Sequence, residues 1–232
     1  MHFEILTIFP KLFESFTNEA LIARAIKKKI IKITAYNLRK WTQDNHQTVD
    51  GRPYGGGAGM VMLVEPIQKA VNRVQGLGPR VKKKSRIILF SAKGKKFNQA
   101  TAKKWSKLDQ LIFICGRYEG IDERVAKYIA DEEVSIGDYV LFGGEVPAMA
   151  VMEAVTRNLS GAVGKEESVQ NESFTAGFLE HPHYTRPEAI KIKGKVRRVP
   201  KVLLSGNHAK IREWRKVHSE QMTRKFRPEL LK

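Results

Sequence analysis

Short apolar runs alternate with amphipathic stretches over the first 160 residues. The runs FEILTIF, IIKITAY, RIILFS and LIFIC, at residues 3–9, 30–36, 86–91 and 111–115, are rich in β-branched and aromatic residues and predict strands. Helical periodicity occupies residues 11–29, 97–107 and 122–130, and returns from Pro147 to about residue 159. This alternation is typical of βαβ units, so it predicts an α/β domain with a mainly parallel sheet covered on both faces.

Glycine-bearing turns follow three of the predicted strands. RIILFS runs into AKGKK, LIFIC runs into GRYEG, and the segment EVSIGDYVLFGGE at residues 133–145 contains a Gly-Gly pair. Ligands of α/β sheets bind at the carboxyl ends of parallel strands. The pattern therefore predicts one pocket to which three strand ends contribute.

The pattern changes after residue 160. Residues 160–170, SGAVGKEESVQ, lose apolar periodicity and gain glycine, serine and charge, which predicts a linker. Beyond it lie a short apolar run, VLLSG, and an amphipathic basic helix over about residues 207–224, which Asn207 or Ser205 can cap. We therefore expect a first domain over residues 1–160, a linker over 161–171 and a smaller basic domain over 172–232.

Positive charge is concentrated in two segments. The 232 residues include 42 Lys and Arg against 24 Asp and Glu, a formal net charge of +18. Residues 80–107 hold eleven of these cations and no acid, residues 191–232 hold fourteen with three acids, and the remainder is slightly acidic. Such patterning favours a polyanion that contacts the protein at two places, and Trp214 and Phe226 permit stacking on bases. RNA or DNA is the expected partner.

Composition excludes several other classes of protein. With 42% hydrophobic and 28% charged residues the chain is too apolar for a disordered polycation. No apolar run approaches the ~20 residues that span a bilayer, and the N-terminus lacks the features of a signal peptide, so we expect a cytoplasmic protein without membrane association. Cys115 is the single cysteine, which excludes an internal disulfide and a cysteine-based metal cluster.

A glycine-rich loop, DGRPYGGGAG, occupies residues 50–59. Five glycines in ten residues allow close backbone approach to a planar or anionic ligand. The chain contains neither GxGxxG nor GxxxxGK[ST], which disfavours a dinucleotide-dependent oxidoreductase and a P-loop kinase. A tight loop without a ligand remains an alternative.

Several motifs in a fixed order give the chain a specific resemblance. DxRPYGGGxGM, CGRYEGID, SIGDYVLxGGE, PHYTRP and VPxVLLSGNHAxIxxWR occur between residues 50 and 215. In this order they resemble the bacterial tRNA (guanine-N1)-methyltransferases, the TrmD family of the SPOUT superfamily. The resemblance covers nearly the whole chain, and any one motif alone would be far less specific.

The resemblance implies a fold that periodicity does not predict. It implies an α/β domain whose mainly parallel sheet carries a deep trefoil knot, followed by a small, mostly helical C-terminal domain that binds tRNA. Periodicity alone predicts an ordinary doubly wound sheet, because threaded chains are very rare. The resemblance also implies a homodimer with its active site at the subunit interface.

The implied reaction is transfer of a methyl group from S-adenosyl-L-methionine to N1 of guanosine 37 in tRNA, next to the anticodon. Carried over motif by motif, the cofactor pocket comprises Phe90, Ser91, Gly116, Tyr118, Glu119, Ile136, Gly137, Asp138, Tyr139, Val140, Leu141, Gly143, Gly144 and Pro147. The candidate substrate-binding residues, on or beside the glycine-rich loop, are His46, Asp50, Arg52, Tyr54, Gly57 and Gly59. The resemblance also suggests a Mg²⁺ requirement, for which the sequence offers no metal-ligand cluster.

Guanine N1 carries a proton, so its methylation needs a proton acceptor and a group that stabilises negative charge on O6. The resemblance assigns these roles to Glu172 and Arg157, with Glu180 as a competing carboxylate. Family members usually carry aspartate where this chain has Glu172, and we expect activity to be retained. Two alternatives remain open: a catalytically silent RNA-binding protein of the same fold, and a SPOUT methyltransferase that acts on another RNA position.

Overall fold

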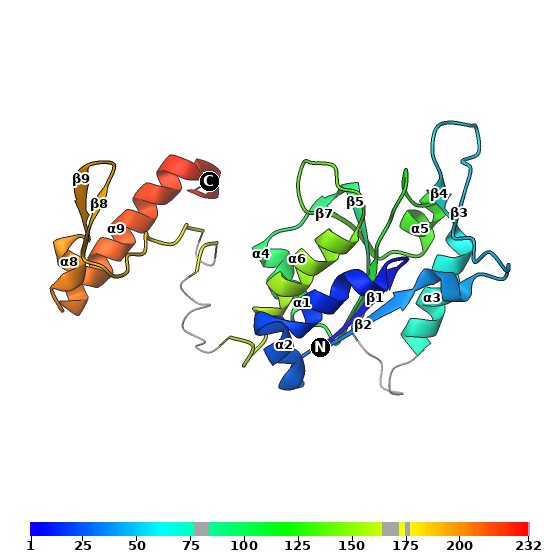
Figure 1. Ribbon diagram of the computed structural model, residues 1–232, viewed down its shortest axis with the longest axis horizontal. Helices are drawn as coiled ribbons and strands as arrows, with labels where there is room; N and C mark the ends of the chain where they lie inside the picture. Colours follow the sequence, from blue (N-terminus) through cyan, green and yellow to red (C-terminus); the bar gives the residue numbers. More distant parts are fainter. Residues whose placement is uncertain (77–83, 164–171, 175–176, 232) are drawn as a thin grey trace. The chain divides into compact units, whose positions relative to one another are not determined.

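A computed structural model describes residues 1–76, 84–163, 172–174 and 177–231. The chain forms two compact units, Met1–Gly164 and Lys165–Lys232 (Figure 1). Residues 164–171 of the expected linker and residues 80–83 of the first basic segment lie outside the described residues.

A five-stranded sheet forms the centre of the first unit. Its strands are β1 (His2–Thr7), β2 (Lys32–Asn37), β5 (Ser85–Lys96), β6 (Gln110–Ile114) and β7 (Glu132–Ser135). The spatial order is β2-β1-β6-β5-β7, and every neighbouring pair is parallel. The prediction of an α/β domain with a mainly parallel sheet is therefore confirmed.

Helices cover both faces of this sheet (Figure 1). One face packs against α1 (Glu14–Asn18), α2 (Ala20–Lys27), α4 (Gln99–Trp105) and α6 (Glu145–Thr156), and the other against α3 (Val64–Gly76) and α5 (Glu123–Tyr128). In β6, Leu111 and Phe113 join the first apolar cluster, whereas Ile112 and Ile114 join the second. This alternation follows from the two-residue period of a strand, and it explains why strands covered on both faces are apolar throughout.

The helix predicted over residues 11–29 is divided in the structure. A 3₁₀ turn, η1 (Pro10–Phe13), leads into α1, and the chain breaks at Glu19 before α2 begins. Glu19 is extended, and Ala20 has a φ of 53°. The sequence analysis also did not predict α3, the 3₁₀ turn η2 (Leu38–Trp41), or the short antiparallel pair β3 (Asp50–Gly51) and β4 (Val61–Met62).

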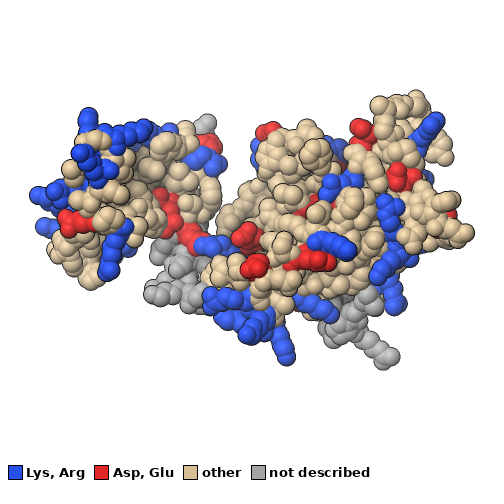
Figure 2. Space-filling model, viewed as in Figure 1, with Lys and Arg blue, Asp and Glu red and all other residues tan. Residues whose placement is uncertain are grey.

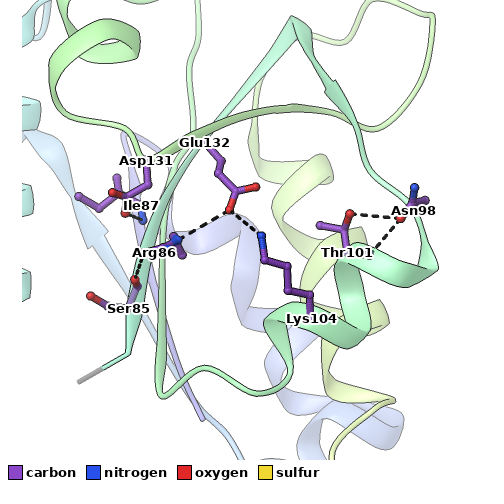
Figure 3. Close-up of polar contacts among 8 residues, drawn as sticks. All are labelled: Ser85, Arg86, Ile87, Asn98, Thr101, Lys104, Asp131 and Glu132. Carbon is purple, nitrogen blue, oxygen red and sulfur yellow. Dashed lines mark hydrogen bonds and ion pairs between the residues drawn. The ribbon is translucent and has the colours of Figure 1, made fainter. Parts of the chain in front are cut away.

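Polar contacts fix the start of β7 against β5 and α4 (Figure 3). Glu132 Oε1 lies 3.8 Å from both Arg86 Nε and Lys104 Nζ, and Asp131 Oδ2 accepts a 2.8 Å hydrogen bond from the Ile87 amide. Asn98 caps α4, its side chain accepting a hydrogen bond from the Thr101 amide. Solvent-exposed ion pairs contribute little to stability, but these contacts do occupy two cations of the first basic segment.

The second unit contains a hairpin and a long helix. The hairpin joins β8 (Ala189–Ile192) to antiparallel β9 (Lys195–Arg198), and α8 (Lys201–Leu204), α9 (His208–Phe226) and the 3₁₀ turn η3 (Pro228–Leu231) follow. Asn207 Oδ1 accepts a 3.1 Å hydrogen bond from the Lys210 amide, so the predicted asparagine cap is confirmed. Within the described residues, no helix combines the length and apolar character needed to cross a membrane.

Candidate functional site

The carboxyl ends of β5, β6 and β7 surround a pocket of about 570 Å³ in the first unit. Its wall is formed by residues 89–93 within β5, residues 116–121 after β6, Glu123 and Ala126 of α5, and residues 133–137, 139–144 and 147 around the end of β7. This volume lies in the range of small-molecule sites. The segment after β6 begins where that strand ends, whereas the segments at β5 and β7 begin within those strands. The pocket therefore lies where the sequence predicts a ligand, at the loops that follow these parallel strands.

The turn after β6 is fixed by backbone hydrogen bonds. The Glu119 amide donates to the Met60 carbonyl at 3.0 Å, and the Met62 amide donates to the Gly120 carbonyl at 2.9 Å. Tyr118 and Gly120 have φ values of 61° and 140°, which allow the chain to reverse within two residues. Asp122 then caps α5, and hydrogen bonds from Arg124 hold the pKa of Asp122 below its usual value.

Gly144 brings the chain after β7 into contact with the turn after β6. Its amide donates to the Gly116 carbonyl at 3.0 Å. A Cβ atom at residue 144 would lie 2.7 Å from Cys115 Cα and 3.1 Å from the Gly116 nitrogen. Only glycine therefore permits this approach, which joins two of the three pocket walls.

A buried ion pair lies beneath the same contact. Arg117 Nε donates to Glu145 Oε2 at 2.9 Å, and the Thr7 hydroxyl donates to Glu145 Oε1 at 2.7 Å. The Glu145 side chain is 1% exposed and that of Arg117 is 21% exposed. Burial, with a smaller contribution from Glu145, raises the pKa of the Cys115 thiol well above its usual value, which favours the neutral core role inferred from the sequence.

The chain leaves the sheet briefly within β5, before its last two residues pair with β7 again. Phe90 and Lys95 both face Val134 of β7, so residues 91–94 form an excursion, and Ser91, Ala92 and Lys93 line the pocket. Lys93 Nζ lies 2.5 Å from Glu123 Oε2 on α5 and 3.8 Å from Glu133 Oε1 on β7. The hydrogen bond to Glu123 raises the pKa of Lys93, and the same bond lowers the pKa of Glu123.

The structure brings thirteen of the fourteen predicted cofactor residues to this pocket. They are Phe90, Ser91, Gly116, Tyr118, Glu119, Ile136, Gly137, Tyr139, Val140, Leu141, Gly143, Gly144 and Pro147. Asp138 does not line it, because its carboxylate is exposed and lies 2.7 Å from Lys96 Nζ. The sequence analysis did not assign Lys93, Arg117, Glu123 or Glu133, although Arg117 belongs to the GRYEG motif that predicted the site.

The glycine-rich loop lies next to the pocket turn without lining the pocket. None of the candidate substrate residues is part of the pocket wall: His46, Asp50, Arg52, Tyr54, Gly57 and Gly59. Asp50 pairs with Met62 in the β3–β4 ladder, and the Tyr54 side chain is fully exposed. Gly59, with a φ of 79°, lies against the Glu119 side chain so closely that a Cβ would collide with it. The loop thus meets the pocket through Glu119.

The two candidate catalytic residues belong to different units. Arg157 follows α6 in the first unit, and its amide donates to the Glu153 carbonyl at 3.0 Å. Glu172 belongs to the second unit and is half-buried. The competing carboxylate, Glu180, lies 3.0 Å from His183 Nε2.

Metal ligands do not cluster in the part of the chain that the structure describes. No group of three or more His, Cys, Asp or Glu side chains there is arranged to hold an ion. The Mg²⁺ requirement suggested by the resemblance stays a prediction.

The two basic segments differ in how their cations are used. In the first, Lys93 and Lys96 form ion pairs with Glu123 and Asp138, and Arg86 and Lys104 share Glu132. In the second, Arg227 pairs with Glu229, whereas Lys191, Lys193 and Lys195 on the hairpin are exposed and pair with no described acid. Blue side chains gather along the upper and outer edges of the second unit (Figure 2).

Comparisons with known proteins agree with these motifs along the whole chain. A family model described as tRNA (Guanine-1)-methyltransferase TrmD matches residues 1–232. Proteins named tRNA (guanine-N(1)-)-methyltransferase from Citrifermentans bemidjiense and Clostridium novyi are 46% and 48% identical to the chain over 231 and 232 residues. These matches cover 100% of this chain and 90% and 92% of the two relatives. The chain is therefore a member of the tRNA (guanine-N1)-methyltransferase family, TrmD.

Proposed function

We propose that this protein methylates N1 of guanosine 37 in tRNA, with S-adenosylmethionine as the methyl donor. The observation that carries the proposal is the family match over every residue, together with a pocket at the ends of β5, β6 and β7. S-adenosylmethionine, when bound, supplies an electrophilic methyl group on a positively charged sulfur.

The pocket wall fits a donor of this kind. Gly116, Gly143 and Gly144 expose backbone to the cavity, and Tyr118 and Tyr139 offer aromatic surface. The wall carries three carboxylates, Glu119, Glu123 and Glu133, against Lys93 and Arg117, and Arg117 is already neutralised by Glu145. A wall with an excess of negative charge favours a cationic ligand.

The chemistry at guanine is assigned to Glu172 and Arg157. The carboxylate of Glu172 accepts the N1 proton, and the guanidinium of Arg157 stabilises the negative charge that moves onto O6. A glutamate reaches one methylene farther than aspartate. Because a misplacement of about 1 Å can cost on the order of 100-fold in rate, the backbone around Glu172 must compensate for this extra length.

The proposed assembly is a homodimer with its active site at the subunit interface. Support comes from the loop that follows β7, where Val140 and Phe142 are 93% and 95% exposed, and from the start of α6, where Val146 is 59% exposed. Exposed apolar residues gathered on one loop are typical of protein interaction sites. Because Val140 and Phe142 also line the pocket, a partner seated there would help enclose it.

Substrate binding is assigned to the basic second domain, residues 172–232. The hairpin lysines, which pair with no described acid, favour this, since phosphate contacts need cations that are not already neutralised. The first basic segment contributes less to tRNA binding than its composition suggests, because half of its eight described cations form ion pairs. The cytoplasm is the proposed location, where tRNA is modified.

The knot is also part of the proposal. Strand β7 lies at one edge of the sheet. The segment that follows it passes the turn after β6 and continues into α6, which packs on β1 and α4. A connection across the carboxyl ends of two intervening strands is what a threaded SPOUT topology requires.

Single-turnover methylation of tRNA by Glu172 variants tests the chemistry. Glu172→Gln keeps the size of the side chain and removes the base, so we expect the rate to fall by at least about 100-fold with S-adenosylmethionine binding unchanged. Glu172→Asp should retain most of the activity. Arg157→Lys keeps the charge but not the planar donor pair, so an intermediate loss is expected. An unchanged rate in Glu172→Gln would contradict this assignment, and Glu180→Gln would then be the next variant.

A further inference from the structure

Two hydroxyl groups near the end of α9 hold the backbone of an earlier segment of the second unit. Thr223 Oγ1 accepts a 2.8 Å hydrogen bond from the Leu179 amide, and the Ser219 hydroxyl donates to the Leu179 carbonyl. Both backbone groups of Leu179 are therefore bonded to one helix, as a neighbouring antiparallel strand would bond them. Thr223 also donates to the Ser219 carbonyl at 2.8 Å, so its hydroxyl acts as acceptor and donor at once.

These contacts lie on one face of the helix. Ser219, Thr223 and Arg227 are four residues apart, which is the spacing that aligns side chains along a helix. The Arg227 guanidinium carbon lies 5.4 Å from the centre of the Phe174 ring, close enough for a cation–π interaction. Of the 19 residues of α9, all of which the structure describes, Thr223 alone is buried. A buried hydroxyl is costly unless it is hydrogen-bonded, and the contact with Leu179 meets this need.

The segment held by α9 leads back to the proposed base, Glu172. Ser173 follows that residue directly, and its Oγ accepts a 3.0 Å hydrogen bond from the Glu180 amide. The Phe174 amide donates to the Phe178 carbonyl at 2.8 Å. The two ends of the segment are therefore joined to each other, and its later end is joined to α9. Together these bonds restrict the backbone that carries the Glu172 side chain.

The rate of proton abstraction depends on where the carboxylate is placed. A misplacement of about 1 Å can cost on the order of 100-fold. We propose that Thr223 and Ser219 are positioning residues: by fixing the backbone of residue 179, they set the place from which Glu172 reaches guanine N1. This inference rests on the proposed function, in which Glu172 is the base.

Single-turnover methylation at saturating tRNA and S-adenosylmethionine, with the Kd of each measured separately, tests the proposal. Thr223→Val keeps the shape of the side chain but cannot accept the hydrogen bond from Leu179. Its rate should fall about 10- to 100-fold, while both Kd values stay as in wild type. Thr223→Ser keeps the hydroxyl and should recover most of the rate.

The same substitution in Glu172→Gln separates positioning from a general loss of structure. If Thr223 acts only through the base, Thr223→Val should have no further effect once the base is absent. A merely structural defect would slow both proteins by the same factor. Ser173→Ala removes the acceptor of the Glu180 amide at the other end of the network. It should show the same two effects, and it keeps the proposal testable if Thr223→Val does not fold.

Thr17→Val is the matched control. Thr17 donates to the Phe13 carbonyl four residues earlier at the start of α1, just as Thr223 donates to the Ser219 carbonyl, and it does not line the pocket. Its rate and both Kd values should equal those of wild type. The melting temperature of each variant verifies that it is folded.

A folded Thr223→Val that methylates at the wild-type rate, beside a slow Glu172→Gln, would overturn the inference and leave the base assignment intact. An equal loss of rate in the Glu172→Gln background would overturn it too, as would a raised Kd for tRNA with an unchanged rate at saturation. If Glu172→Gln methylated as fast as wild type, the proposed base would be wrong and the inference would fail with it.

Discussion

Replacing Gly144 with alanine should open the pocket and weaken the fold at one point. Gly144 has φ −83° and ψ −4°, which alanine adopts without strain, so the cost is entirely steric. The new Cβ would lie 2.7 Å from Cys115 Cα, whereas ordinary contact begins at 3.4 Å. Two backbone segments must therefore separate by about 0.7 Å, because neither contact atom belongs to a flexible side chain.

The size of the effect follows from that displacement. Overpacking of a rigid site costs about 1–3 kcal/mol, which lowers the melting temperature by roughly 2–12 °C for a unit of this size. The separation also shifts the turn after β6 relative to the loop after β7. Since a displacement of about 1 Å can cost on the order of 100-fold, we expect affinity for S-adenosylmethionine and the methylation rate to fall by at least about tenfold.

Thermal melting of the unliganded protein and calorimetric titration with S-adenosylmethionine measure the two effects separately. Gly76→Ala is the matched control, because a Cβ at this helical residue meets no atom within 4 Å and its φ is not positive. Its melting temperature should equal or slightly exceed that of wild type, since alanine favours a helix. A Gly144→Ala protein that melts and binds the donor like wild type would refute the steric argument.

Three other predictions concern different parts of the molecule. Phe142→Asp places a charge on the exposed loop after β7, so analytical ultracentrifugation should show a monomer in place of the proposed dimer. An unchanged dimer would exclude this loop from the interface. Burial raises the pKa of Glu4 in the folded protein. The protonated side chain therefore stabilises the fold at low pH, and this contribution to the free energy of unfolding is lost as the pH rises. Glu4→Gln should therefore raise the melting temperature at pH 8 and have little effect near pH 4. Replacing Lys193 and Lys195 with glutamine should lower the salt dependence of log Kd for tRNA by about one unit per lysine, whereas Arg86→Gln should leave it unchanged.

Much of the first unit could be predicted because its signals are local. The strands β1, β5 and β6 follow from apolar runs of β-branched and aromatic residues, and the pocket follows from glycines in the turns associated with β5, β6 and β7. The limits of these elements are less predictable. β5 continues past Ser91 to Lys96, because Gly94 lies so close to Val134 that no side chain would fit between them. A lone glycine in a basic run gives no sign of that contact.

The parts of the site that escaped prediction depend on long-range pairing. Thr7 and Glu145 are 138 residues apart in sequence, so no local pattern indicates that they share a hydrogen bond. Asp138 shows the opposite case: its motif predicts a place in the pocket, yet Lys96 holds its carboxylate at the surface. The family resemblance identifies a motif, and tertiary contacts decide which of its side chains face the cavity.

Mapping the methylated nucleotide tests the central claim most directly. A tRNA transcript with guanosine at position 37 is incubated with the protein and S-adenosylmethionine carrying an isotopically labelled methyl group, and the digested RNA is analysed by mass spectrometry. The account predicts one labelled nucleoside, N1-methylguanosine at position 37, and no label when that guanosine is replaced by adenosine. Label at another nucleotide, or none from a folded protein that binds both the donor and tRNA, would contradict it.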